Sequence, residues 1–142
     1  MGGWAKRLHF ASRAVMDSVL HPYDLGSTQW YVLYVLVNDG PTTQRDLARL
    51  LEVERATLSG VVAALVRKGL VDQATDSADQ RRRVLCITDA GRGLWERLPD
   101  PAALILALAF GDADPVELET ARRVLQAAVE RLNDHLSKET GK

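Results

Sequence analysis

A change of apolar period inside residues 43–91 constrains this fold more than any other feature of the sequence. Two stretches, about 44–51 and 54–68, carry leucine, valine or alanine at every third or fourth position, which predicts two short helices. In two further short stretches, about 70–75 and 83–88, apolar and polar residues alternate, which predicts β-strands. Two helices joined by a tight turn and followed by a β-hairpin make a winged helix-turn-helix.

The second helix of such a unit suits the major groove of duplex DNA, where base edges present a full donor and acceptor code. Its apolar stripe, from Leu58 to Leu65, is predicted to face the core. The opposite side holds small residues that let the backbone approach base edges, with Arg55, Thr57 and Ser59 beside them as hydrogen-bonding groups. The two hydroxyl residues also fit a solvated helix surface, so their role as base contacts stays open.

Three adjacent arginines, Arg81 to Arg83, lie at the tip end of the predicted hairpin, in a chain whose formal net charge is only -1. Like charges at this spacing repel one another, and an isolated triplet is often a solvated loop. At the tip of a wing, the arginines would instead reach a neighbouring minor groove, whose negative potential attracts arginine. The predicted DNA-binding residues are Thr43, Gln44, Arg55, Thr57, Ser59, Gly60, Arg67, Asp79, Arg81, Arg82 and Arg83.

Four motifs in register, DLARLLEVERATLS, LVRKGLV, DSADQR and LCITDAG, resemble the MarR family of bacterial transcriptional regulators. The motifs cover the whole predicted DNA-binding core, and the flanking helices have the family's order. The resemblance implies that Asp79 orients a basic side chain and that Arg81 enters the minor groove. It also implies phosphate contacts for Arg82 and Arg83.

The sequence departs from the family pattern at three places. Gln80 stands where an arginine is common, and Glu54 replaces the usual serine cap. A glutamate suits the positive end of a helix, but it would repel a nearby phosphate and weaken some base contacts. Pro99 and Pro101 are expected to break or kink what is one long helix in the family.

Apolar stripes near both ends of the chain predict dimerisation helices. These stripes are too extensive for a small domain's own surface, and a DNA reader with two half-sites is usually a dimer. The resemblance implies the same, because members of the family dimerise through their terminal helices. The alternative is that both stripes pack within one chain. The predicted dimerisation residues are Trp4, Leu8, Ala11, Val15, Leu118, Ala121, Leu125, Ala128 and Leu132.

The resemblance also implies a crevice for a small aromatic or anionic effector. Arg13, Trp30 and Tyr34 are the candidates to line it. The alternative is that Trp30 and Tyr34, which lie four positions apart on a predicted helix, are ordinary core residues.

Several other functions are not expected from this sequence. The three histidines have no carboxylate or thiol at ligand spacing, so we expect no metal or other cofactor. The single cysteine, Cys86, lies on a predicted strand and is expected to be structural, and it fits a reducing compartment such as the cytoplasm. No catalytic motif is apparent, so we expect no enzyme. We expect no leader and no membrane contact, because no apolar run approaches the ~20 residues of a span.

These patterns together predict a mainly α-helical protein with a small β-hairpin wing, folded as a single domain over residues 1–142. The DNA-binding core is expected at about 27–91, and the dimerisation helices at about 3–20 and 89–137. The predicted function is a homodimeric repressor that binds palindromic operators on double-stranded DNA and is released by a small ligand. Two alternatives remain: a winged helix that binds proteins instead of DNA, and a DNA binder without an effector.

Overall fold

The computed structural model describes residues 2–75, 78 and 82–141. The chain divides into two compact units, Met1–Ala102 and Ala103–Lys142, which are described separately below. None of the helices in the described residues combines the length and apolarity that a membrane crossing needs.

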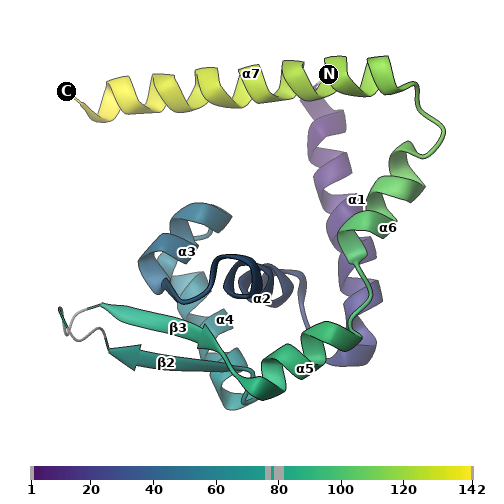
Figure 1. Cartoon of the computed structure of the whole chain (residues 1–142). Helices are drawn as coiled ribbons and strands as arrows, with labels where there is room; N and C mark the ends of the chain where they lie inside the picture. The colour runs from purple at the N-terminus through teal and green to yellow at the C-terminus, as the bar shows by residue number, and fades with distance from the viewer. Residues whose placement is uncertain (1, 76–77, 79–81, 142) are drawn as a thin grey trace. The chain divides into compact units, whose positions relative to one another are not determined.

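The first unit is a winged helix in which α2, α3 and α4 lie against a small sheet (Figure 1). The mainly α-helical prediction with a β-hairpin wing is therefore confirmed. The helices are α1 (Gly2–Leu20), the short 3-10 helix η1 (His21–Tyr23), α2 (Ser27–Asp39), α3 (Gln44–Leu51), α4 (Arg55–Arg67) and α5 (Asp89–Arg97). The strands are β1 (Thr42–Thr43), β2 (Val71–Thr75) and β3 (Arg83–Ile87).

The sheet is antiparallel with the strand order β1-β3-β2. The predicted hairpin is confirmed: β2 pairs with β3, from Val71 opposite Ile87 to Thr75 opposite Arg83. The two-residue strand β1 was not predicted. It forms because the residues that lead into α3 lie against β3, where Thr42 pairs with Leu85.

The core of this unit is apolar and is built mainly from α2 and α4. Leu58 and Leu65 of α4 are buried, as the apolar stripe predicted. On α3, the leucine spacing predicts that Leu47, Leu50 and Leu51 point inward. Leu47 is buried, but the prediction for Leu50 was wrong, because that side chain is 58% exposed. Ala48 is buried instead, and Leu50 lies two residues further, about 200° around the helix, so the two cannot share a face.

The sequence predicts helix caps at Ser27, Thr43, Thr88 and Asp114, and the last three are confirmed. The hydroxyl of Thr43 accepts from the Asp46 N–H at 3.1 Å, and the hydroxyl of Thr88 accepts from the Gly91 N–H at 3.0 Å. The carboxylate of Asp114 accepts from the N–H that follows its proline at 3.0 Å. These side chains satisfy backbone donors that have no partner inside a helix.

The sequence also predicts Ser27 as the cap of α2, and this prediction was wrong. Gly26 is the cap residue, and Ser27 is the first residue of the helix. The backbone N–H of Ser27 donates to a carboxylate oxygen of Asp17, on α1, at 3.0 Å. A side chain from the preceding helix thus takes over the capping role, and it ties α1 to the start of α2.

Helix α5 begins in very close contact with the sheet. A Cβ atom added to Gly91 would lie 2.3 Å from the carbonyl oxygen of Leu70 and 2.7 Å from Cγ1 of Ile87. Only a residue without a side chain permits this approach. Gly69 follows the end of α4 and has a φ of 75°. The sequence predicts a left-handed residue at this position, because glycine adopts that conformation at little cost.

The second unit consists of most of α6 (Pro101–Phe110) and all of α7 (Pro115–Thr140). The prolines interrupt the helix as predicted, because α5 ends at Arg97 and α6 begins at Pro101. Helix α7 extends to Thr140, slightly beyond the predicted end. None of its residues is buried.

Candidate nucleic-acid interface

Helix α4 presents one apolar and one polar face. Leu58, Val62 and Leu65 are buried, at three- and four-residue spacing. The predicted DNA-binding residues of this helix are all exposed: Arg55, Thr57, Ser59, Gly60 and Arg67. The sequence thus predicted correctly which face of α4 is buried. The polar face is exposed and available to a partner.

An open groove of about 890 Å³ lies in front of the leading end of α4. Residues from α3, α4 and the segment that enters β3 form it. Its lining is Thr43, Gln44, Arg45, Asp46, Arg49, Arg55, Ser59, Arg82 and Arg83. Five guanidinium groups face a single carboxylate there, which makes the groove strongly positive and suited to a polyanion.

The groove brings together six of the predicted site residues: Thr43, Gln44, Arg55, Ser59, Arg82 and Arg83. The lining of the groove does not include the other three predicted residues of α4, which are Thr57, Gly60 and Arg67. Asp79 and Arg81, together with the departure at Gln80, lie outside the described residues.

Arg45 and Arg49 line the groove but were not predicted as site residues. They are four positions apart on α3, a spacing that places them on one side of the helix. Arg49 Nη2 lies 2.6 Å from a carboxylate oxygen of Asp46, in a pair that is largely exposed. Such surface pairs contribute ~1 kcal/mol or less, so a phosphate can replace the carboxylate at little cost.

Three uncharged side chains link the elements around the groove. Gln44 Nε2 donates to the hydroxyl oxygen of Ser59 at 2.7 Å, which joins α3 to α4. Gln73 Nε2, from β2, donates to Gln44 Oε1 at 3.3 Å. The hydrogen bonds thus connect the wing, the first helix and the second helix of the helix-turn-helix.

Glu54, the unusual residue at the start of α4, is exposed at the cap position. Its side chain makes no capping hydrogen bond. The expected effect of its charge on phosphate binding stays a prediction.

Comparison with known proteins identifies the fold and its role. A family model described as the MarR family matches residues 23–83, the segment that holds α2 to β2 and the start of β3. This segment of the chain belongs to the MarR family. Members of this family are DNA-binding transcriptional regulators with a winged helix, and they are not enzymes.

Individual relatives agree with this assignment. The HTH-type transcriptional repressor NicR of Pseudomonas putida is 30% identical over 93 residues, which are 66% of this chain and 59% of that protein. A probable transcriptional regulator from Pseudomonas aeruginosa is 30% identical with a TM-score of 0.79, over 90% of this chain and 96% of that one. BpsR of Bordetella bronchiseptica is 25% identical with a TM-score of 0.80, over 90% and 97%. The matched region spans about three-fifths of the length of NicR.

The terminal helices of the chain expose the apolar stripes that the sequence predicted. On α1, Trp4 is 70% exposed, and on α7, Leu132 is 65% exposed. Of the remaining predicted dimerisation residues, Leu8, Ala11, Ala121, Leu125 and Ala128 are exposed, whereas Val15 and Leu118 are partly buried. Each stripe therefore has apolar surface available to a partner.

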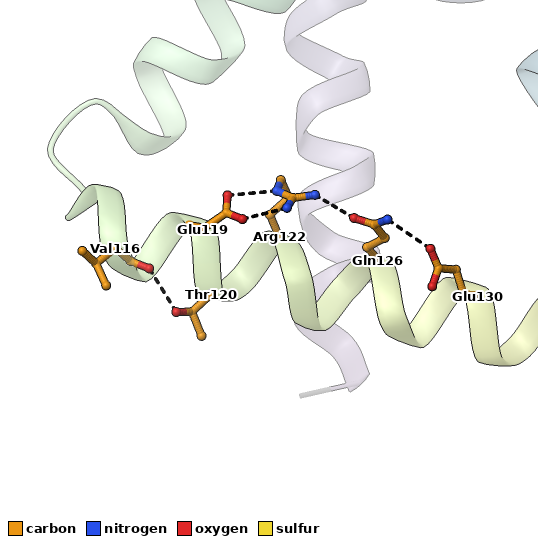
Figure 2. A network of polar contacts seen from close by, with 6 residues as sticks. All are labelled: Val116, Glu119, Thr120, Arg122, Gln126 and Glu130. Atoms are coloured by element: carbon orange, nitrogen blue, oxygen red, sulfur yellow. Dashed lines mark hydrogen bonds and ion pairs between the residues drawn. The ribbon is translucent and has the colours of Figure 1, made fainter.

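A polar network runs along α7 beside its apolar stripe (Figure 2). Arg122 donates to both carboxylate oxygens of Glu119, at 2.7 and 3.0 Å, and to Gln126 Oε1 at 2.6 Å. Gln126 in turn donates to Glu130 at 3.0 Å. The hydrogen bonds from Arg122 hold the pKa of the Glu119 carboxyl below its ordinary value.

The three candidate effector residues differ in how exposed they are. Trp30 is 4% exposed and is a core residue, stacked on Tyr34 with ring centroids 5.3 Å apart. Tyr34 is 47% exposed, and Arg13 is exposed on α1. Trp95 of α5, which sequence reasoning missed, also packs on Trp30 at 5.3 Å. The three predicted residues thus do not form a single exposed set, and the effector site stays a proposal.

Proposed function

We propose that this protein is a homodimeric transcriptional repressor that binds palindromic operator DNA and is released by a small aromatic or anionic ligand. The observation that carries the proposal is the groove in which α3, α4 and β3 present five arginines around the exposed end of α4. In this proposal α4 enters the major groove of DNA, and arginines of the groove contact the flanking phosphates.

The proposed DNA contacts divide by chemistry. Arg55, Thr57 and Ser59 read base edges, and the small residue Gly60 allows the backbone to approach them. Thr43, Gln44 and Arg67 position the protein on the backbone. In the wing, Arg81 enters the minor groove with the help of Asp79, while Arg82 and Arg83 contact phosphates.

The proposed dimer rests on the exposed apolar stripes of α1 and α7. Side chains as large as Trp4 and Leu132 are costly to leave in water, because each buried leucine contributes about 1.5–3 kcal/mol. A symmetric dimer that covers them would present two copies of α4 to two half-sites of a palindrome. We further propose that both units fold as a single domain.

The proposed effector is a small aromatic or anionic compound. Support comes from a relative, BpsR, whose DNA binding is regulated by 6-hydroxynicotinic acid. Arg13 offers a positive charge and Tyr34 an exposed ring for such a molecule. The single cysteine fits a reducing compartment, and we propose that the protein acts in the cytoplasm.

The proposed function is tested by fluorescence anisotropy with duplexes from the region upstream of the protein's own gene, at two salt concentrations. Nanomolar, salt-dependent binding with a clear preference over scrambled DNA is expected. Arg55→Ala and Arg82→Ala should weaken binding several-fold, and Arg82→Ala should reduce the slope of log affinity against log salt by about one. Arg92→Ala, which removes the same charge from α5 outside the groove lining, is the matched control and should bind as the wild type does.

Two results would each favour an alternative function. Weak binding that is equal for every duplex, in a genomic library as well as the upstream region, would favour a winged helix that binds proteins. Operator binding that no phenolic or nicotinic acid weakens would favour a DNA binder without an effector.

A further inference from the structure

The side chain of Gln73 has a defined place in the fold although it is exposed. Gln73 lies in the middle of β2 and pairs with Leu85 of β3. Side chains of directly opposite residues in an antiparallel pair lie on the same face of the sheet. Because Leu85 is buried, Gln73 projects from the face that is turned toward the helices. That placement explains how its amide reaches Gln44 on α3.

Two hydrogen bonds define which end of the Gln44 amide faces Ser59. Gln44 Oε1 accepts from Gln73 Nε2, so the Nε2 group of Gln44 is the end that faces Ser59. The hydroxyl oxygen of Ser59 therefore accepts a hydrogen bond, and its own proton is left to donate elsewhere. Rotating only the Gln44 amide would place two donors opposite each other at Gln73 and would lose that hydrogen bond.

Ser59 holds this hydroxyl at the exposed surface of α4, inside the lining of the arginine groove. A hydroxyl that donates to a base edge discriminates between the bases. In the major groove, N7 and O6 of guanine, N7 of adenine and O4 of thymine are acceptors, whereas the amino groups of cytosine and adenine are donors.

We propose that Gln73 is a positioning residue for operator recognition, which acts through Gln44 to hold the Ser59 hydroxyl as a hydrogen-bond donor toward an acceptor on a base edge. This inference rests on the proposed function, since it requires that α4 reads DNA in the major groove. It adds a strand residue, remote from the bases, to the set that determines specificity. It also makes the position of the wing part of base recognition, because β2 carries Gln73.

The test is a double-mutant cycle on the ratio of operator to scrambled-duplex affinity. The operator is the sequence that the wild-type protein enriches from a random duplex pool. Gln73→Met keeps the length and apolar stem of the side chain but removes its donor. Because one hydrogen bond contributes about 0.5–1.5 kcal/mol, Gln73→Met should lower the ratio by about three- to tenfold. Ser59→Ala should lower it at least as much, and the double variant should match Ser59→Ala alone.

Further measurements separate positioning from a general structural effect. The melting temperature and the salt dependence should stay unchanged in Gln73→Met, because the side chain is exposed and uncharged. Gln73→Lys, which retains a donor, should restore the ratio, whereas Gln73→Glu, which can only accept, should not. Thr75→Val, on the same strand and face, is the matched control and should leave the ratio unchanged.

Three results would overturn the inference. One is an unaltered ratio in Gln73→Met, and another is a double variant whose loss equals the sum of the two single losses. The third is a wild-type protein that enriches no sequence at all, which would refute the proposed function together with the inference. In the first two cases the wild-type operator preference would remain, so the proposed function would stand.

Discussion

Replacement of Gly91 by alanine should destabilise the protein, because α5 has no room for a methyl group there. The added Cβ would lie 2.3 Å from the carbonyl oxygen of Leu70, a backbone atom that cannot move by itself. Overpacking of this kind costs about 1–3 kcal/mol. The same carbonyl accepts from the Thr88 N–H at 3.1 Å, so its displacement would cost about 1 kcal/mol more.

One effect opposes this loss. Alanine is more favourable than glycine inside a helix by about 1 kcal/mol. The net expectation is a loss of about 1–3 kcal/mol in the free energy of unfolding. For a chain of this length, that corresponds to a fall of about 4–12 °C in the melting temperature. Thermal unfolding followed by circular dichroism measures the shift.

Gly93 provides the matched control on the same helix. A Cβ added there meets nothing within 4 Å, so Gly93→Ala should gain the helix-propensity term alone and melt slightly higher than the wild type. A Gly91→Ala variant that melts at or above the wild-type temperature would refute the reasoning. It would mean that α5 does not pack against the sheet at this distance.

The terminal helix permits two further predictions. In an NMR titration, the carboxyl of Glu119 should titrate below 4.5, and Arg122→Ala should return its pKa toward that value. Because the pKa is lowered in the folded state, the stabilising effect is present above pH 4.5 and is lost as the pH falls through the lowered pKa. In sedimentation, the double variant Leu125→Glu/Leu132→Glu should weaken dimerisation by roughly a hundredfold or more, since each buried leucine contributes about 1.5–3 kcal/mol. Arg123→Glu, which changes the net charge equally, should remain dimeric, and a dimer that survives the leucine changes would contradict the proposed interface.

Local signals in the sequence predicted most of the winged helix. The bounds of α3 agree with the prediction, because Thr43 marks its start and the short apolar stripe limits its length. The hairpin followed from alternation and the α5 start from Thr88. In each case the signal lies within a few residues of the structure that it predicts, so no knowledge of distant contacts is required.

The features that the sequence did not predict depend on contacts between distant segments. Strand β1 has only two residues and therefore no period, and it exists because Leu85 lies opposite. The cap of α2 comes from Asp17, ten residues earlier on another helix. Trp95 reaches Trp30 from 65 positions away. No local pattern in the sequence encodes such pairs.

The candidate site shows the same limit of local signals, because two arginines of the positive groove were not predicted. Arg45 and Arg49 alone are unremarkable, since arginines four positions apart commonly occupy the solvated side of a helix. They gain a functional meaning only because β3 pairs with the residues that precede α3 and so brings Arg82 and Arg83 to the same groove. The positive potential is thus a property of the sheet pairing as well as of the arginine content. A substitution that weakens the pairing of β1 with β3 should therefore reduce DNA affinity without removing any charge.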